Sequence, residues 1–240
     1  MRLDGVEVEP VPCHRSCAVW VSTGREGERA TIAETDPPPL DRHEVDALYS
    51  VMLAAGLLAG VAVLTGPSDP GLLPAESYRR LASDLSANGA RVVADVAMSA
   101  LEPVLEGGVD VLKVSHEDLV ESGWMREDSR DGAVAAIAAL RAAGARAVVV
   151  SRAADPALAD TGDELLEIVP PQLGELNRRG AGDAMTGALA AGVARAEPLP
   201  DALRLAAAAG TLNVTRRGLG TGQRRAIEEL AGLVRLRRLP

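Results

Sequence analysis

Alternation of short apolar runs with helical patterns constrains the fold of this 240-residue chain more than any other feature of its sequence. From residue 41 onward, helical segments separate strand-like apolar runs at residues 61–64, 91–95, 109–113 and 146–151. Continuous apolar runs of this length are typical of parallel strands that are covered on both faces. The alternation therefore predicts an α/β fold with a mostly parallel central sheet between helices.

Start and stop signals mark the helices that fill the intervals. Asp41 and Glu44 have the spacing of a capping box at the start of one helix, and Gly60 is a natural turn after it. That helix is expected to end near residue 55. The remaining predicted elements are helices at residues 75–87, 99–106, after 115, 132–143, from 181, from 201 and 223–234, and a hairpin of strands at 158–160 and 164–169.

Residues 1–36 differ from the rest because apolar and polar residues alternate, as in strands with one solvated face. Three prolines at residues 37–39 then interrupt the chain. We therefore expect a small β layer, a partial lid, over residues 1–36 and an α/β core over residues 37–240. The predicted lid strands cover residues 6–9, 18–21 and 30–33, with a hairpin turn at 23–28.

Composition narrows the classes of partner and compartment. The formal net charge of −9 argues against a nucleic-acid partner bound by a broad basic patch. The longest apolar run, residues 51–65, is shorter than the roughly 20 residues that a membrane span needs. In an extended strand the Cα atoms of Cys13 and Cys17 lie about 13 Å apart, too far for a disulfide. Together with a polar N-terminus, these observations favour a cytoplasmic protein with no membrane partner.

The segment Gly180-Ala181-Gly182-Asp183 opens a run of small residues and has the composition of an anion-binding helix N-terminus. A carboxylate beside an anion repels it, unless the carboxylate takes a proton from an incoming hydroxyl. The combination suggests phosphoryl transfer to an alcohol. The alternative is a glycine-rich helix start in which Asp183 is an ordinary N-terminal charge.

Polar residues follow most of the predicted strands. Ligands of open parallel sheets bind at the carboxyl ends of the strands, so these residues are candidates for one shared site. Strand ends are polar in most α/β proteins, which is the alternative explanation. The residues concerned are Ser68, Asp69, Asp95, Lys113, Ser115, Ser151 and Asp183.

Taken together, these motifs resemble the ribokinase-like (PfkB-type) carbohydrate kinases, most closely their phosphofructokinase branch, over nearly the whole chain. Residues 180–183 match the GAGD signature of that family, and residues 66–71 resemble its G-S-L-P-P-G loop. Residues 110–119 resemble its K-P-N-x-x-E segment, and residues 213–220 its nucleotide-side segment. Arg15-Ser16 stands where the family lid usually has an R-T pair. The resemblance implies a three-layer α/β/α fold with a small β lid.

The resemblance also implies roles for individual residues. Asp183 would be the catalytic base that deprotonates a sugar hydroxyl, and the amides of Gly180, Ala181 and Gly182 would form an anion hole. The substrates would be ATP, accompanied by Mg²⁺, and a sugar or sugar phosphate. Independently of the resemblance, a thin β layer with apolar faces is unstable alone, so we expect the lid to pair with the lid of a second subunit in a homodimer. The remaining implied site residues are Lys113, Ser115, Ser151 and Asn213 for the nucleotide and, indirectly, Asp118 for the metal.

The chain departs from the family pattern at the nucleotide and metal side. Ser115 and Asp118 stand where the family has Asn and Glu. Residues 153–156 replace a Gly-x-x-Gly turn, which is expected to reshape that side of the site. Asn177-Arg178 replaces Asp-Thr. Either Arg178 or its neighbour Arg179 could contact a phosphate, or both are solvated.

The N-terminal segment of the family, with its Gly-Gly-x-x-x-Asn sugar motif, has no counterpart here. We expect a fragment, a misplaced start or a genuinely shortened protein. Two functions therefore stay open: an active ATP-dependent carbohydrate kinase, and a truncated or degenerate member that binds nucleotide or sugar phosphate without catalysis. A dinucleotide oxidoreductase lacks the Gly-x-Gly-x-x-Gly that should follow an early strand.

Overall fold

The computed structural model describes residues 2–3, 6–14, 16, 19–22, 31–35, 38–66, 71–96, 98–174, 178–216 and 218–240. Some of the residues discussed above lie outside this set. They are Arg15, Cys17, the predicted turn at 23–28, Ser68, Asp69 and Asn177.

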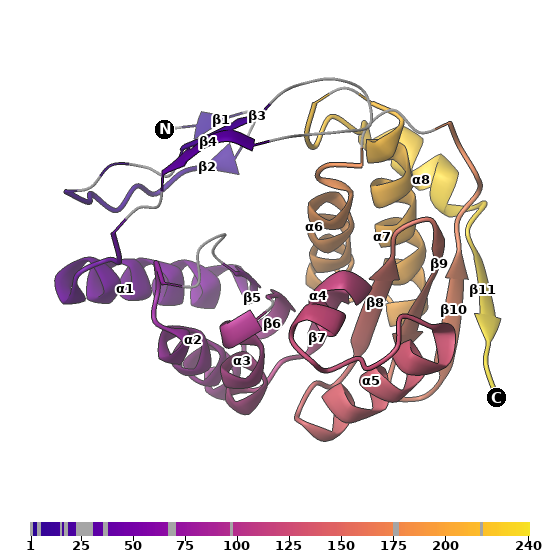
Figure 1. Cartoon of the computed structure of the whole chain (residues 1–240), viewed down its shortest axis with the longest axis horizontal. Coiled ribbons are helices and arrows are strands. Elements are labelled where there is room, and N and C mark those ends of the chain that lie inside the picture. Colours follow the sequence, from indigo (N-terminus) through magenta and orange to yellow (C-terminus); the bar gives the residue numbers. More distant parts are fainter. Residues whose placement is uncertain are drawn as a thin grey trace.

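A seven-stranded sheet forms the centre of the molecule, in the order β11-β10-β9-β8-β7-β6-β5 (Figure 1). Strands β5 to β8 are parallel, β10 runs in their direction, and β9 and β11 run the opposite way. The predicted mostly parallel sheet is therefore confirmed. Its strands are β5 (Val61–Thr65), β6 (Arg91–Asp95), β7 (Val111–Ser115), β8 (Val148–Arg152), β9 (Asp155–Asp160), β10 (Leu165–Val169) and β11 (Arg235–Arg238).

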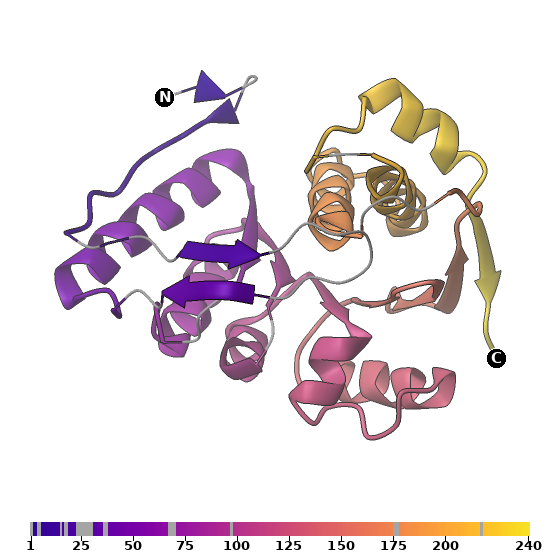
Figure 2. The same ribbon diagram turned by 45° about the horizontal axis from the view of Figure 1, so that its top comes forward.

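Helices cover both faces of this sheet, as Figures 1 and 2 show. Alternate residues of each strand enter different cores: Leu112 and Val114 pack with the first layer, and Val111 and Val149 with the second. The first layer holds α1 (Arg42–Ala59), α2 (Ala75–Ala87), η1 (Met98–Ala100), α3 (Leu101–Gly107), α4 (His116–Glu121) and α5 (Arg130–Ala142), and the second α6 (Ala181–Ala194), α7 (Leu199–Val214) and α8 (Arg224–Ala231).

Helix α1 begins at the capping box that the sequence predicts. The Asp41 side chain accepts from the amide of Glu44, and the Glu44 carboxylate accepts from the amide of Asp41, both at 2.9 Å. The helix extends to Ala59, past the predicted end, and stops where Gly60 adopts the left-handed conformation with φ 71°.

Strand β5 corrects the expectation of a strand covered on both faces. It is the last strand of the sheet, and Val63 is 40% exposed. The apolar run does form a strand, as predicted, but its position in the sheet depends on contacts that a local pattern does not contain.

The prediction for the C-terminal segment is also wrong. The last helix ends at Ala231 instead of residue 234, and β11 follows it. Strand β11 escaped prediction because arginines surround its single apolar residue, Leu236. Arg237 and Arg238 pair with Glu167 and Glu164 of the neighbouring strand region, so charge pairing supports this edge.

The N-terminal segment forms two small antiparallel sheets outside the three layers (Figure 1). One pairs β1 (Arg2–Leu3) with β2 (Val6–Glu7), and the other pairs β3 (Val19–Ser22) with β4 (Thr31–Thr35). The backbone amide of His14 donates to Glu44 Oε1 at 3.0 Å, which joins this segment to α1. In the part of the chain that the structure describes, no helix has the length and apolar character to cross a bilayer.

Candidate active site

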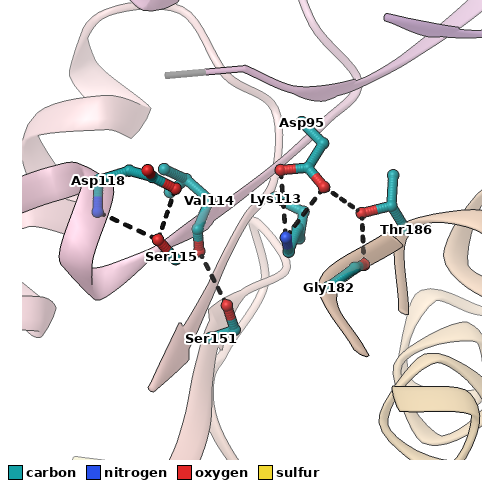
Figure 3. A network of polar contacts seen from close by, with 8 residues as sticks. All are labelled: Asp95, Lys113, Val114, Ser115, Asp118, Ser151, Gly182 and Thr186. Carbon is teal, nitrogen blue, oxygen red and sulfur yellow. Dashed lines mark hydrogen bonds and ion pairs between the residues drawn. The ribbon is translucent and has the colours of Figure 1, made fainter. Parts of the chain in front are cut away.

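The carboxyl ends of the central parallel strands lie side by side beside the first turns of α6 (Figure 3). Asp95 is the last residue of β6, Ser115 is the last residue of β7, and Ser151 is the next-to-last residue of β8. Register places Ser115 directly beside Ser151. The structure thus brings together residues that the sequence places after separate strands.

Gly180 is the N-cap that precedes helix α6, and its φ of 76° is left-handed. This conformation favours glycine, and a Cβ at this position would lie 2.7 Å from Leu219 Cδ2. The amide of Ala184 donates to the carbonyl of Gly180 at 2.9 Å and closes the first turn. Asp183 lies in that turn with an exposed side chain, so its carboxylate is accessible to a ligand.

The amides of this turn are not equally accessible. The Ala181 amide donates to the carbonyl of Arg178 at 3.2 Å. For the amides of Gly180 and Gly182, no acceptor occurs among the residues that the structure describes. Two of the three predicted anion-hole donors are therefore available, at the positive end of the dipole of a 14-residue helix.

A buried polar network lies beneath the first turns of α6 (Figure 3). The Lys113 ammonium donates to both carboxylate oxygens of Asp95, at 3.1 and 2.9 Å. The Thr186 hydroxyl lies 2.6 Å from Asp95 Oδ2 and 3.0 Å from the carbonyl of Gly182. Lys113 is 5% exposed and Thr186 2%. Sequence reasoning missed Thr186, and its only signal was a hydroxyl within a run of small apolar residues.

Lys113 also explains the glycine at position 182. A Cβ on Gly182 would lie 2.9 Å from Lys113 Nζ, closer than a methyl group tolerates. Because the Lys113 ammonium donates to both carboxylate oxygens of Asp95, the ammonium cannot easily move aside. The backbone of α6 therefore passes directly over a buried ion pair.

The second polar cluster lies between β7 and β8 (Figure 3). Ser115 is the N-cap of α4 and accepts from the amide of Asp118 at 3.1 Å. Its hydroxyl donates to the Asp118 carboxylate, and the Ser151 hydroxyl is 3.5 Å from the carbonyl of Val114. The Ser115 hydroxyl thus orients the half-buried carboxylate of Asp118 at the edge where the strands end.

Asn213 joins the segments on either side of the α6–α7 pair. Its Nδ2 donates to the carbonyl of Arg179 at 2.8 Å, and its Oδ1 accepts from the amide of Gly220 at 3.2 Å. It is 2% exposed. The two arginines before α6, Arg178 and Arg179, have exposed side chains.

The turn after β8 remains tight although it lacks glycine. Ala153 adopts φ 48°, in the left-handed region where glycine is preferred, and β9 begins at Asp155. An alanine in this conformation costs about 1 kcal/mol.

A tyrosine fixes the end of β5 near this edge. The Tyr78 hydroxyl donates to the carbonyl of Thr65 at 3.1 Å, and the next amide, of Gly66, donates to the carbonyl of Asp95 at 3.1 Å. Burial raises the pKa of Tyr78 to about 12. Within the described ranges, no group of three or more His, Cys, Asp or Glu side chains could hold a metal ion.

Residues 43–225 match the family described as pfkB family carbohydrate kinase. The chain belongs to this family. The 1-phosphofructokinase of Bacillus subtilis is 31% identical over 179 residues, which are 75% of this chain and 58% of that protein. The 1-phosphofructokinase of Xanthomonas campestris is 35% identical over 145 residues, which are 58% of this chain and 45% of that protein. The chain thus spans about half the length of these relatives.

The fold is that of the same family. The crystal structure of phosphofructokinase-2 from Escherichia coli superposes with a TM-score of 0.75 at 24% identity, covering 90% of this chain and 69% of that one. The predicted resemblance and the ribokinase-like three-layer fold are therefore confirmed.

Proposed function

We propose that this protein is an ATP-dependent carbohydrate kinase of the phosphofructokinase type, which transfers a phosphoryl group to a hydroxyl of a sugar or sugar phosphate. One observation carries the proposal: an exposed Asp183 in the first turn of α6, beside two amides that have no acceptor among the described residues and next to a polar network. The names of the relatives support the same reaction class.

The proposed chemistry assigns each group one task. The acceptor hydroxyl oxygen bonds to the γ-phosphorus of ATP while the bond from that phosphorus to the β,γ-bridging oxygen breaks, and ADP leaves. Asp183 takes the hydroxyl proton. The Gly180 and Gly182 amides stabilise the negative charge that develops on the phosphoryl oxygens. The Ala181 amide joins them when a phosphoryl oxygen replaces the Arg178 carbonyl as its acceptor.

The nucleotide side of the site would lie along β7 and β8. The proposed nucleotide-side residues are Lys113, Ser115, Ser151 and Asn213. The Lys113 ammonium lies next to Gly182, where its positive charge would attract the phosphates. Magnesium would arrive as part of the substrate MgATP and shield the phosphate charges. The Asp118 carboxylate, an oxygen donor of the kind that magnesium prefers, would face its water ligands.

The variant Asp183→Asn tests the base. Transfer from MgATP to fructose 6-phosphate or fructose 1-phosphate should fall by a factor of about 10² to 10⁴, while ATP binding measured by calorimetry stays near that of the wild type. Asp201→Asn is the matched control, because Asp201 is an acidic residue in the first turn of the next helix, α7. It should leave transfer unchanged.

Each outcome separates the two functions left open above. Retained transfer in Asp183→Asn would show that another group is the base. Binding of ATP by a wild type that transfers nothing to either sugar phosphate would support the non-catalytic alternative. No transfer, together with no heat from ATP or from either sugar phosphate, would contradict both.

We further propose that residues 1–36 form a partial lid over the core of residues 37–240 and pair with the lid of a second copy, in a cytoplasmic homodimer. Val19, Val21 and Ile32 of β3–β4 are 52%, 46% and 64% exposed, and a two-stranded sheet with apolar faces is marginal alone. Sedimentation should show a dimer, and a pure monomer at micromolar concentration would end this part of the proposal.

A further inference from the structure

Helix α6 is joined to strand β6 by one side-chain hydrogen bond near each of its ends. Near its C-terminal end, the Arg91 guanidinium donates to the carbonyl of Val193. At the site end, the Thr186 hydroxyl contacts Asp95 Oδ2 at 2.6 Å (Figure 3). Because a hydroxyl has one proton, it donates either to this charged oxygen or to the carbonyl of Gly182, and the shorter, charge-assisted bond is the stronger.

We propose that Thr186 is a positioning residue for phosphoryl transfer. Through Asp95 it holds the start of α6, and therefore Asp183 and the Gly182 amide, at a fixed place relative to the ends of β6 and β7. The proposal rests on the proposed kinase function and adds to it a residue that touches neither substrate.

A general property of helices and two observations of this structure support this role. The first turn of a helix has the fewest intrahelical bonds and is free to shift unless something outside the helix holds it. Thr186 lies one turn after Gly182, on the buried side of α6. Lys113 holds both oxygens of Asp95 and lies against Gly182, so the acceptor of the Thr186 proton is itself immobile.

The test compares Thr186→Val, which removes the hydroxyl at nearly constant volume, with Thr186→Ser, which keeps it. The probes are MgATP with fructose 6-phosphate and fructose 1-phosphate. Thr186→Val should lower kcat about 10- to 100-fold and leave the KM for ATP within about twofold, because misplacement affects the transition state most. Thr186→Ser should restore most of the rate.

Arg91→Met is the matched control, since it removes the bond at the far end of the same helix. It should lower the melting temperature but keep the kcat of the folded protein. Wild-type kcat in Thr186→Val, or an equal fall of kcat in Arg91→Met, would overturn the proposal, because the role would then be absent or merely structural.

Hydrogen–deuterium exchange separates this proposal from the kinase function. In Thr186→Val, amides in residues 181–190 should exchange faster than in the wild type, and Thr186→Ser should restore their protection. If the wild type transfers phosphate to neither sugar, the proposed function fails and exchange alone decides the role of Thr186: unchanged protection overturns it. If Thr186→Val does not fold, Thr186→Ala makes the same comparisons without placing a methyl group against Asp95.

Discussion

The first turn of α6 and the β3–β4 hairpin are both short segments at the surface, but different contacts hold them. Beneath the first turn of α6 lies the polar network of Asp95, Lys113 and Thr186, in which Lys113 and Thr186 are buried and Asp95 is half-buried. In the hairpin, the side chains that the structure describes are all exposed. The core thus supplies the contacts that fix the proposed catalytic turn. The hairpin, in contrast, needs a partner such as the lid of a second copy to cover its apolar side chains.

The largest expected effect is on the network itself. Lys113→Met should lower the free energy of unfolding by about 3–5 kcal/mol, because it leaves the Asp95 carboxylate without its buried cation. Urea denaturation measures this. Arg146→Met breaks the ion pair of Arg146 with Asp110 instead, in which the arginine side chain is 76% exposed, and should cost less than about 1 kcal/mol. Equal losses would show that the network contributes no more than a surface pair.

A smaller effect is expected where α6 crosses the ion pair. Gly182→Ala should destabilise by about 1–2 kcal/mol, because the new methyl meets Lys113 Nζ and outweighs the helix preference for alanine. Gly187→Ala, in the same helix, has no atom within 4 Å of the added Cβ and should stabilise by up to about 1 kcal/mol. Urea denaturation should therefore give changes in unfolding free energy of opposite sign for the two variants. Changes of equal sign would contradict the idea that the ion pair beneath Gly182 restricts this position.

Tyr78→Phe tests the support of β5 and should cost about 1 kcal/mol near neutral pH, through the lost bond to Thr65. Since folding raises the pKa of Tyr78 from 10.0 to about 12, the folded state binds the phenolic proton more tightly than the unfolded state. This stabilisation is complete below pH 10 and is lost as the pH rises toward 12. The difference in unfolding free energy between the wild type and Tyr78→Phe should therefore narrow between pH 10 and 12. A difference that stays constant over this range would contradict the assignment.

The smallest effect on folding is expected in the hairpin. Replacing Val19 and Val21 with serine should change the free energy of unfolding by less than about 0.5 kcal/mol, because both side chains are already exposed. The same change should shift sedimentation from dimer to monomer if the lids pair. A large loss of stability would instead show that the hairpin packs against the core of the same molecule.

Much of the core could be predicted from the sequence because its signals are local. The capping box of Asp41 and Glu44, strand β6 and helix α2 lie where the patterns place them. Local patterns did not reveal that β5 is an edge strand, or that residues 235–238 form β11, because partners elsewhere in the chain determine both. The predicted roles of Asp183 and the nucleotide-side residues stay predictions until the variants above are measured.

The sequence by itself determined that a helix begins after Gly180 with an acid in its first turn, since glycine, small residues and a carboxylate are local signals of such a start. Only the tertiary structure decided what lies beneath that helix. Asp95 and Thr186 are 91 residues apart, and Lys113 comes from a third element. Their meeting depends on how the parallel strands and α6 pack, and a hydrogen bond between such distant residues leaves no periodic pattern in the chain.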